Sequence, residues 1–319
     1  MSAPSHQEPL DALRTLLRSF GQIVLQPSAA TGACILAAWL VCDPRLACAA
    51  LTGAIAANIG ALLRGYDAAD TRDGLHGFNG ALASLAAFTF IAEDSTAIAV
   101  AILAATAVAW LLGPWARLLR SYGLGVYSSP CLLVTWTWLP LVHPASAHAA
   151  ATDTFAWLAL MRGMFAGLAQ TSFAGGALAG ALILGGIAWS SRRSALFALA
   201  GAALATSSLW LVCADYAALD AGLLGFNGAL AALALADCGA PAALMGVGIA
   251  VALQQAASMY GVPALSAPFV LATWTVRVLA RDTRREHATH KEIPVRVAQH
   301  VRASDVDRHA AGRAVSPER

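Results

Sequence analysis

Charged side chains are scarce in this chain of 319 residues: 12% are Asp, Glu, Lys or Arg, whereas 58% are hydrophobic. An ordinary soluble domain carries about 25% charged residues, and the mean hydropathy here is +0.64. Four uncharged runs approach or exceed the length of about 20 apolar residues that a helix needs to cross a bilayer. They are residues 96–115, 121–142, 194–214 and 238–276. The composition excludes a typical soluble domain and predicts an all-α polytopic membrane protein, whose spans satisfy their own backbone hydrogen bonds.

Other features are absent as well. Residues 1–20 contain acidic and basic side chains but no apolar signal-peptide core, so we expect the first span to direct its own insertion. The six cysteines lack metal-ligand spacing and lie in or beside apolar segments, which favours small core residues over a disulfide or zinc framework. We therefore predict neither a metal nor a cofactor. Residues 282–319 are densely charged and lack an apolar period, which predicts a disordered cytoplasmic tail.

Asparagine is also rare, and its distribution is informative. It occurs three times, at Asn58, Asn79 and Asn227. The last two lie in one repeated word, GFNGALA, which spans residues 77–83 and again 225–231. The two copies are 148 positions apart, and chance is a poor explanation for a repeat that contains so rare a residue.

Further landmarks recur between the two halves of the chain. Gln22 is followed ten residues later by glycine, and so is Gln170, again at an offset of 148. The run YGLGVYSSPCLLVTWT, which starts at residue 122, is matched by YGVPALSAPFVLATWT from residue 260, at an offset of 138. We interpret the chain as a duplication, with residues 1–150 as the first repeat and 151–281 as the second.

Each half is predicted to contain the same helical elements. A short segment near residues 9–24, and its counterpart near 157–172, are too short and too polar to span. We interpret each as a re-entrant half-helix. Five longer segments follow in each half, near residues 29–42, 46–63, 77–92, 96–117 and 124–141, and near 176–190, 194–212, 225–237, 240–258 and 264–280.

Arginine tests the orientation of these spans, because the chain has a single lysine. With five spans in each half, one side of the membrane collects Arg14, Arg18, Arg64, Arg72, Arg117, Arg120, Arg192, Arg193 and the arginines of the tail. The other side collects Asp43, Arg45, Glu93, Asp94, Asp153, Arg162, Asp215 and Asp220. This positive-inside pattern places both termini in the cytoplasm. An odd number of spans makes the two halves antiparallel, and an inverted repeat with broken helices is typical of solute passage at the repeat interface.

Polar residues that occur in duplicate within apolar segments are the candidates for contact with a solute. They are Gln22 and Gln170, Asn79 and Asn227, Ser128 and Ser266, and Thr135 and Thr273. For the asparagines, capping or packing competes evenly with solute contact, and for the threonines packing is favoured. No ionisable residue is duplicated in these segments. A proton- or ion-coupled transporter usually needs one, so the pattern favours a channel-like path for a small, polar, uncharged solute.

These motifs together resemble those of the urea transporter family: GFNGALA twice, Gln followed by glycine at the same spacing twice, and YGVPALSAPF. The resemblance covers residues 10–280. It implies ten spans in two inverted repeats, two re-entrant half-helices, a homotrimer with one pore in each subunit, and passive urea conduction. The implied setting is a bacterial inner membrane.

By the same resemblance, Phe78 and Phe226 look like the walls of a slot, and Leu82 and Leu230 like its apolar continuation. Gln22 and Gln170 resemble polar residues near the two pore mouths. Ser128 and Ser266 stand where family members have threonine. Two departures are notable: Pro130-Cys131 replaces the first Pro-Phe pair, and Gln170 replaces a glutamate of some members.

Urea suits such a path because it is planar, with four N–H donors and one acceptor. Acceptor oxygens would replace its lost water bonds, and binding at several weak sites would let it leave. Three alternatives stay open at this point. One is a channel for a short amide, ammonia or water. Another is a membrane enzyme, for which we find no nucleophile, base or metal cluster at mid-depth. The third is a scaffold or sensor that binds a partner through the tail. No feature predicts nucleic-acid binding.

Overall fold

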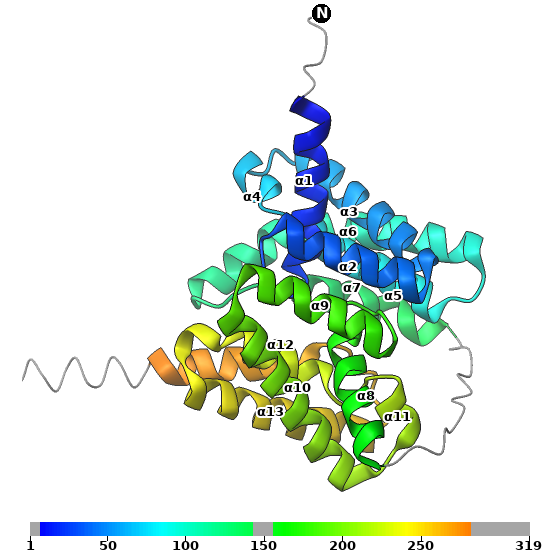
Figure 1. The fold of residues 1–319 in the computed structure, drawn as a ribbon. Coiled ribbons are helices and arrows are strands. Elements are labelled where there is room, and N and C mark those ends of the chain that lie inside the picture. Colours follow the sequence, from blue (N-terminus) through cyan, green and yellow to red (C-terminus); the bar gives the residue numbers. More distant parts are fainter. Residues whose placement is uncertain (1–6, 143–155, 282–319) are drawn as a thin grey trace, which may run out of the picture. The chain divides into compact units, whose positions relative to one another are not determined.

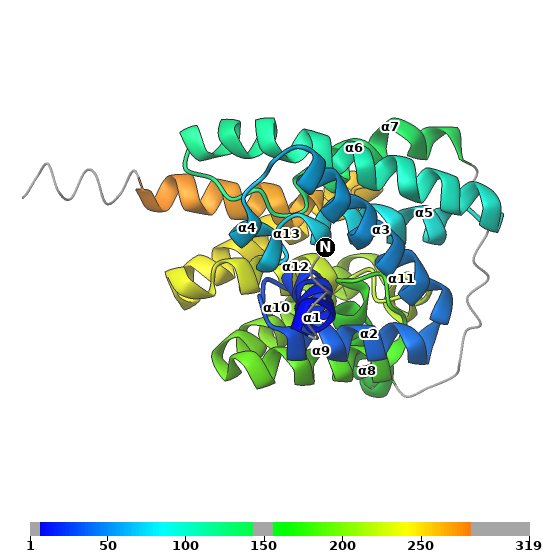
Figure 2. The same cartoon turned by 90° about the horizontal axis from the view of Figure 1, so that it is seen from above.

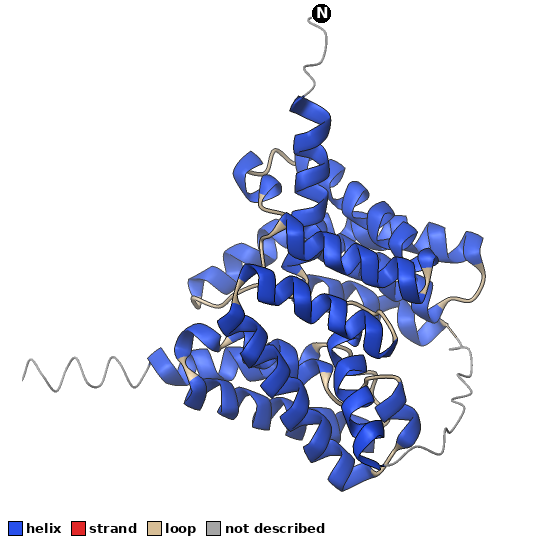
Figure 3. Ribbon diagram, viewed as in Figure 1, coloured by secondary structure: helices blue, strands red, loops and turns tan. Residues whose placement is uncertain are grey.

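The computed structural model describes residues 7–142 and 156–281. The chain divides into two compact units, Met1–Trp274 and Thr275–Arg319. Within the second unit residues 275–281 are described, and they are helical; the account below concerns the first unit. The predicted tail and Asp153 lie outside the described residues. Among the residues described, none lies in a strand (Figure 3), and the predicted all-α fold is confirmed for them.

Most helices of the first half have bounds close to those predicted. The elements of this half are α1 (Gln7–Gln22), α2 (Ala29–Cys42), α3 (Pro44–Leu63), α4 (Ala68–Arg72), α5 (Gly77–Phe90), α6 (Asp94–Ser121), α7 (Ser129–Trp138) and the 3-10 turn η1 (Leu139–Leu141) (Figure 1). Of these, α4 and α7 differ from the prediction.

The second half continues in the same order. Its helices are α8 (Ala156–Gln170), α9 (Gly176–Ser190), α10 (Arg192–Cys213), α11 (Tyr216–Asp220), α12 (Phe226–Ala234), η2 (Ala236–Cys238) and α13 (Ala240–Met259). A further helix begins at residue 267.

Two differences from the predicted elements have local causes. The segment predicted near residues 124–141 becomes helical only at Ser129, because Tyr127 adopts a positive φ of 48° that no α-helix contains. The short helices α4 and α11 were not predicted. Each directly follows an aspartate, Asp67 or Asp215, whose carboxylate caps the helix by accepting a hydrogen bond from a backbone N–H of the first turn.

Four of the described helices are long and apolar enough to cross a membrane, namely α3, α6, α10 and α13. Helices α2, α5 and α9 are equally apolar but have 14 or 15 residues, or about 21–23 Å at ~1.5 Å per residue. The protein is therefore helical and has several candidate membrane spans. The total of ten spans stays a prediction.

The two halves meet along α2 and α9, which lie side by side (Figures 1 and 2). The Thr31 hydroxyl of α2 donates to the Gly186 carbonyl of α9 at 2.8 Å. The buried Trp39 indole N–H donates to the Ser172 carbonyl, also at 2.8 Å. Buried donors must be satisfied, so these bonds join residues more than a hundred positions apart into one core.

Close backbone approaches explain the glycines that follow the two glutamines at equal spacing. A Cβ on Gly32 would lie 1.7 Å from the Leu17 carbonyl oxygen, and one on Gly180 would lie 1.8 Å from the Phe165 carbonyl oxygen. Only glycine fits at such a distance. The repeated spacing therefore packs α1 against α2 and α8 against α9 in the same way.

Candidate functional site

Helices α1 and α8 end in the same strained turn. Leu25 and Phe173 both follow the terminal glutamine by three residues and have φ values of 59° and 60°. The Leu25 N–H donates to the Gln22 carbonyl at 2.9 Å, and the Phe173 N–H donates to the Gln170 carbonyl at 3.1 Å. A non-glycine residue in this region costs about 1–2 kcal/mol, and such strain clusters at functional sites.

A second pair of strained residues precedes the two candidate serines. Tyr127 and Leu265 have φ values of 48° and 49° and stand immediately before Ser128 and Ser266. Four of the five non-glycine residues with positive φ in the described chain thus form two pairs at the offsets of 148 and 138.

The repeated asparagines hold these serine turns in place. The Asn79 side chain donates to the Tyr127 carbonyl at 3.0 Å and accepts from the Cys131 N–H at 3.3 Å. The Asn227 side chain likewise donates to the Leu265 carbonyl at 3.1 Å and accepts from the Phe269 N–H at 3.2 Å.

Each asparagine therefore fixes the turn on one side of its serine and the first helical turn on the other. We call these two arrangements the asparagine clamps. An amide suits them because it carries a donor and an acceptor on one planar group.

The two serines meet each other. The hydroxyl oxygens of Ser128 and Ser266 lie 2.7 Å apart and form a hydrogen bond between the halves. Ser128 is 6% exposed, and Ser266 is half-buried. Sequence alone predicted both residues for one site, but their direct contact was not predicted.

A cavity of about 630 Å³ surrounds the serine pair. We call it the central cavity. Its lining includes nine of the ten predicted site residues: Gln22, Phe78, Leu82, Ser128, Gln170, Phe226, Asn227, Leu230 and Ser266. The four strained residues Leu25, Tyr127, Phe173 and Leu265 line it too. Asn79 is the exception: it is fully buried and does not reach the cavity.

Sequence reasoning missed Gln254, which lies on α13 and lines the central cavity. Its side-chain oxygen accepts from Asn227 at 3.0 Å, and its amide donates to the Leu223 carbonyl. The clamp of the second half therefore has an extra polar partner. The residue at the equivalent offset of 138 in the first half is Ala116, so a search for duplicated polar residues could not find Gln254. The signal in the sequence that could have identified Gln254 is the presence of an amide side chain inside the long uncharged run of residues 238–276.

The central cavity is nearly free of charge. Among the described residues that line it, Asp215 is the one ionisable acid or base of the Asp, Glu, Lys, Arg and His types. The Asp215 carboxylate accepts from the N–H groups of Ala217 and Ala218 at 2.9 and 3.1 Å, at the start of α11. The described residues contain no cluster of His, Cys, Asp or Glu that could hold a metal.

One end of the cavity is tied to the connection between α3 and α5. The Gln22 amide donates to the Asp73 carbonyl at 3.1 Å. The same connection carries His76, which is 6% exposed, stacks on Tyr66 with ring centroids 5.2 Å apart, and bonds to the Thr71 hydroxyl at 2.9 Å. Burial lowers the pKa of His76 below its ordinary 6.5, and the nearby Asp70 and Asp67 partly oppose this effect.

The described part of the chain contains helices and no strands, with apolar helices of membrane-spanning length and a solute-sized, nearly uncharged cavity. These are features of a membrane transport protein. The family model of the urea transporter matches residues 13–281, which is most of the chain. The chain belongs to the urea transporter family, a transport family and not an enzyme family. No curated protein sequence matches it significantly.

Proposed function

We propose that the protein conducts urea passively, as a channel, through the central cavity and past the serine pair. The observation that carries this proposal is the convergence of both halves on one cavity: nine predicted residues line it, and Ser128 and Ser266 bond to each other within it. Family membership supports urea as the solute and a membrane as the setting.

In this proposal the solute path lies between two inverted repeats of the chain. The paired strained turns and the two asparagine clamps support two halves of equal construction. Residues 1–150 and 151–281 form the repeats, α1 and α8 are re-entrant, and both termini are cytoplasmic. The protein assembles as a homotrimer in a bacterial inner membrane, as family resemblance implies.

The lining suits dehydrated urea. Phe78 and Phe226 hold the plane of the molecule between apolar surfaces, and the side chains of Gln22 and Gln170 receive it at the two ends. At the middle, the Ser128 and Ser266 hydroxyls exchange their mutual hydrogen bond for bonds to the urea amides. A neutral hydrogen bond contributes only about 1 kcal/mol net, so the exchange is nearly balanced and the solute does not become trapped.

An ion would lose its hydration without compensation, because most of the lining is uncharged. Asp215 is held by backbone N–H groups at the start of α11, and in this proposal it attracts hydrogen-bond donors to one end of the path. The protein therefore selects small neutral donors over ions of similar size.

The test is stopped-flow light scattering on proteoliposomes loaded with urea, acetamide or glycerol. We expect urea efflux well above that of empty liposomes without a pH gradient, and at least a fewfold loss for the double variant Ser128→Ala/Ser266→Ala, because two acceptors disappear. Ser128→Thr/Ser266→Thr keeps both hydroxyls and is the matched control.

Two results would reject the proposal in part or whole. Unchanged urea flux in the folded alanine variant would remove the serines from the path. Urea flux no faster than that of empty liposomes, from folded wild-type protein, would reject passive urea conduction and leave a short amide, ammonia or water as the solute.

A further inference from the structure

A second hollow lies between α10, α12 and α13 and shares no lining residue with the central cavity. It has a volume of about 270 Å³, and we call it the outer groove. Its walls are almost wholly apolar and include Leu196, Phe197, Ala200, Leu204, Leu244 and Val247. Leu196 and Leu244 are 68% and 56% exposed. Because α10 and α13 are both long enough to span a membrane, this surface would meet lipid wherever no other protein copy covers it.

The outer groove occurs where the second half is shorter than the first. Helix α12 has 9 residues, whereas α5 has 14. Helix α13 has 20 residues, whereas α6 has 28. In the first half the end of α5 and the start of α6 fill this region with a buried cluster, formed by Ala87, Ile91, Ala97 and Ala101. In the second half the helical turns that would correspond to the end of α5 and the start of α6 are replaced by the short turn η2 between α12 and α13.

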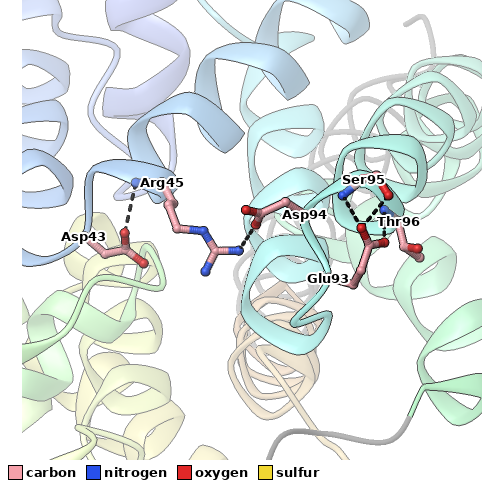
Figure 4. A network of polar contacts seen from close by, with 6 residues as sticks. All are labelled: Asp43, Arg45, Glu93, Asp94, Ser95 and Thr96. Carbon is pink, nitrogen blue, oxygen red and sulfur yellow. Dashed lines mark hydrogen bonds and ion pairs between the residues drawn. The ribbon is translucent and has the colours of Figure 1, made fainter.

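The shortening also removes a carboxylate. Arg45, near the start of α3, forms an ion pair with Asp94 in the first turn of α6 (Figure 4). Its guanidinium lies 5.8 Å from the Phe88 ring centroid. At the start of α3 the Asp43 carboxylate accepts from the Arg45 backbone N–H. Beside Asp94, at the start of α6, the Glu93 carboxylate accepts from the N–H groups of Ser95 and Thr96 (Figure 4).

Arg193 is the counterpart of Arg45 at the offset of 148. It has no such carboxylate. Its guanidinium donates to the Ala236 carbonyl at 2.8 Å and lies 5.7 Å from the Phe197 ring centroid. None of the ion pairs among the described residues involves Arg193 or its exposed neighbour Arg192. Two cations thus stand at the end of an apolar groove whose described walls contain no acid.

We propose that the outer groove binds one anionic phospholipid. Its phosphate bonds to Arg192 and Arg193, since guanidinium groups bind phosphate through paired, charge-assisted hydrogen bonds. Its acyl chain lies along α10 from Leu196 to Leu204. The distance along α10 from Arg193 to Leu204 is about 16 Å at ~1.5 Å per residue. This is about half of a ~30 Å hydrocarbon core, so one chain would reach from the headgroup level to the midplane.

A second copy of the chain fits this surface less well than a lipid. A protein contact that covered the outer groove would have to bring its own carboxylate to Arg192 and Arg193, because the described groove walls have none, and burying an unpaired charge is costly. A lipid phosphate supplies the missing negative charge while its headgroup keeps contact with water.

Native mass spectrometry of the full-length protein in detergent tests the proposal, with dioleoyl-phosphatidylglycerol and dioleoyl-phosphatidylcholine as the added lipids. We expect one phosphatidylglycerol to be retained in preference to phosphatidylcholine. Arg192→Gln/Arg193→Gln should weaken this binding about fivefold for each arginine removed. Ala200→Phe, at an exposed position of the groove wall, should abolish it while both arginines remain.

Arg45→Gln is the matched control, because Arg45 is already paired with Asp94; it should leave phosphatidylglycerol binding unchanged. Equal retention of both lipids, or full retention in the Ala200→Phe variant, would overturn the proposal. A change of oligomeric mass in the Ala200→Phe variant, with lipid retention unaffected, would also overturn it and assign the groove to a contact between copies. None of these readouts depends on solute flux.

Discussion

At the residue scale, the two halves have the same asparagine clamps, but the residues that these clamps position differ between the halves. The Asn227 clamp positions Phe269, whose ring meets Tyr127 edge-on at 5.4 Å between centroids. At the offset of 138, Cys131 of the first half is equivalent to Phe269, and Leu265 of the second half is equivalent to Tyr127. All four line the central cavity. One side of the serine pair is therefore formed by two aromatic rings, and the other by a thiol and an aliphatic side chain.

This inequality predicts how selectivity can be tightened. In the variant Cys131→Phe, a ring would face Leu265 and narrow the central cavity. Under the proposed function, the flux of N-methylurea should then fall by about tenfold relative to that of urea, because one methyl group in a tight site changes the free energy by ~1–3 kcal/mol. Paired stopped-flow measurements give the ratio. Cys131→Ser, of nearly equal size, is the control and should keep the wild-type ratio. An unchanged ratio in Cys131→Phe would show that the thiol side does not contact the solute.

The residue scale also separates what sequence could and could not predict. Duplication identified the residues that line the cavity, because both halves use the same groups. The duplication could not show that Asn227 lines the central cavity and Asn79 does not, because the two asparagines have the same sequence neighbours. It also missed Gln254, which has no counterpart in the first half.

At the element scale, apolar runs between clear capping residues were the most predictable feature. Helix α2 begins after Ser28, whose hydroxyl accepts from the Thr31 N–H, and its predicted and observed bounds agree. The start of α7 was not predictable from its apolar run, because backbone strain at Tyr127, and not composition, decides where that helix begins.

The close approach of α8 and α9 predicts a sharp difference between two glycines of the same helix. Gly180→Ala should lower the free energy of unfolding by about 3 kcal/mol or more, because its Cβ would overlap the Phe165 carbonyl. Gly185→Ala meets no atom within 4 Å and should be neutral or stabilise by about 0.5–1 kcal/mol. Thermal unfolding in detergent measures both. Similar midpoints for the two variants would contradict the observed helix contact.

The connection between α3 and α5 should be sensitive to acid. The pKa of His76 is lowered in the folded protein, so below pH 6.5 the unfolded chain binds a proton that the buried imidazole does not. Stability therefore falls as the pH drops from 6.5 through the folded pKa, and is fully present above 6.5. His76→Leu, which copies Leu224 of the second half, should reduce the loss of melting temperature between pH 7.5 and pH 5.5. An equal loss in both proteins would exclude His76 as its source.

At the scale of the whole molecule, the positive-inside distribution of arginine predicts which surfaces face each compartment. Cys42 and Cys213 are exposed and adjoin the acidic connections at Asp43 and Asp215. In otherwise cysteine-free protein, each should react with a membrane-impermeant maleimide added to intact cells. Ser121→Cys, beside Arg120, should react only after permeabilisation. Labelling of all three in intact cells would reject the proposed orientation.

The hydrogen bonds that α2 donates to α9 and to the turn between α8 and α9 also bear on the order in which the chain is synthesised. When the ribosome has completed the first 150 residues, the Trp39 indole and the Thr31 hydroxyl exist, but the Ser172 and Gly186 carbonyls that accept from them do not. An unpaired donor in hydrocarbon costs several kcal/mol. We therefore expect α2 to reach its final place only after α9 has been synthesised, with the Trp39 indole in a more polar setting than lipid until then.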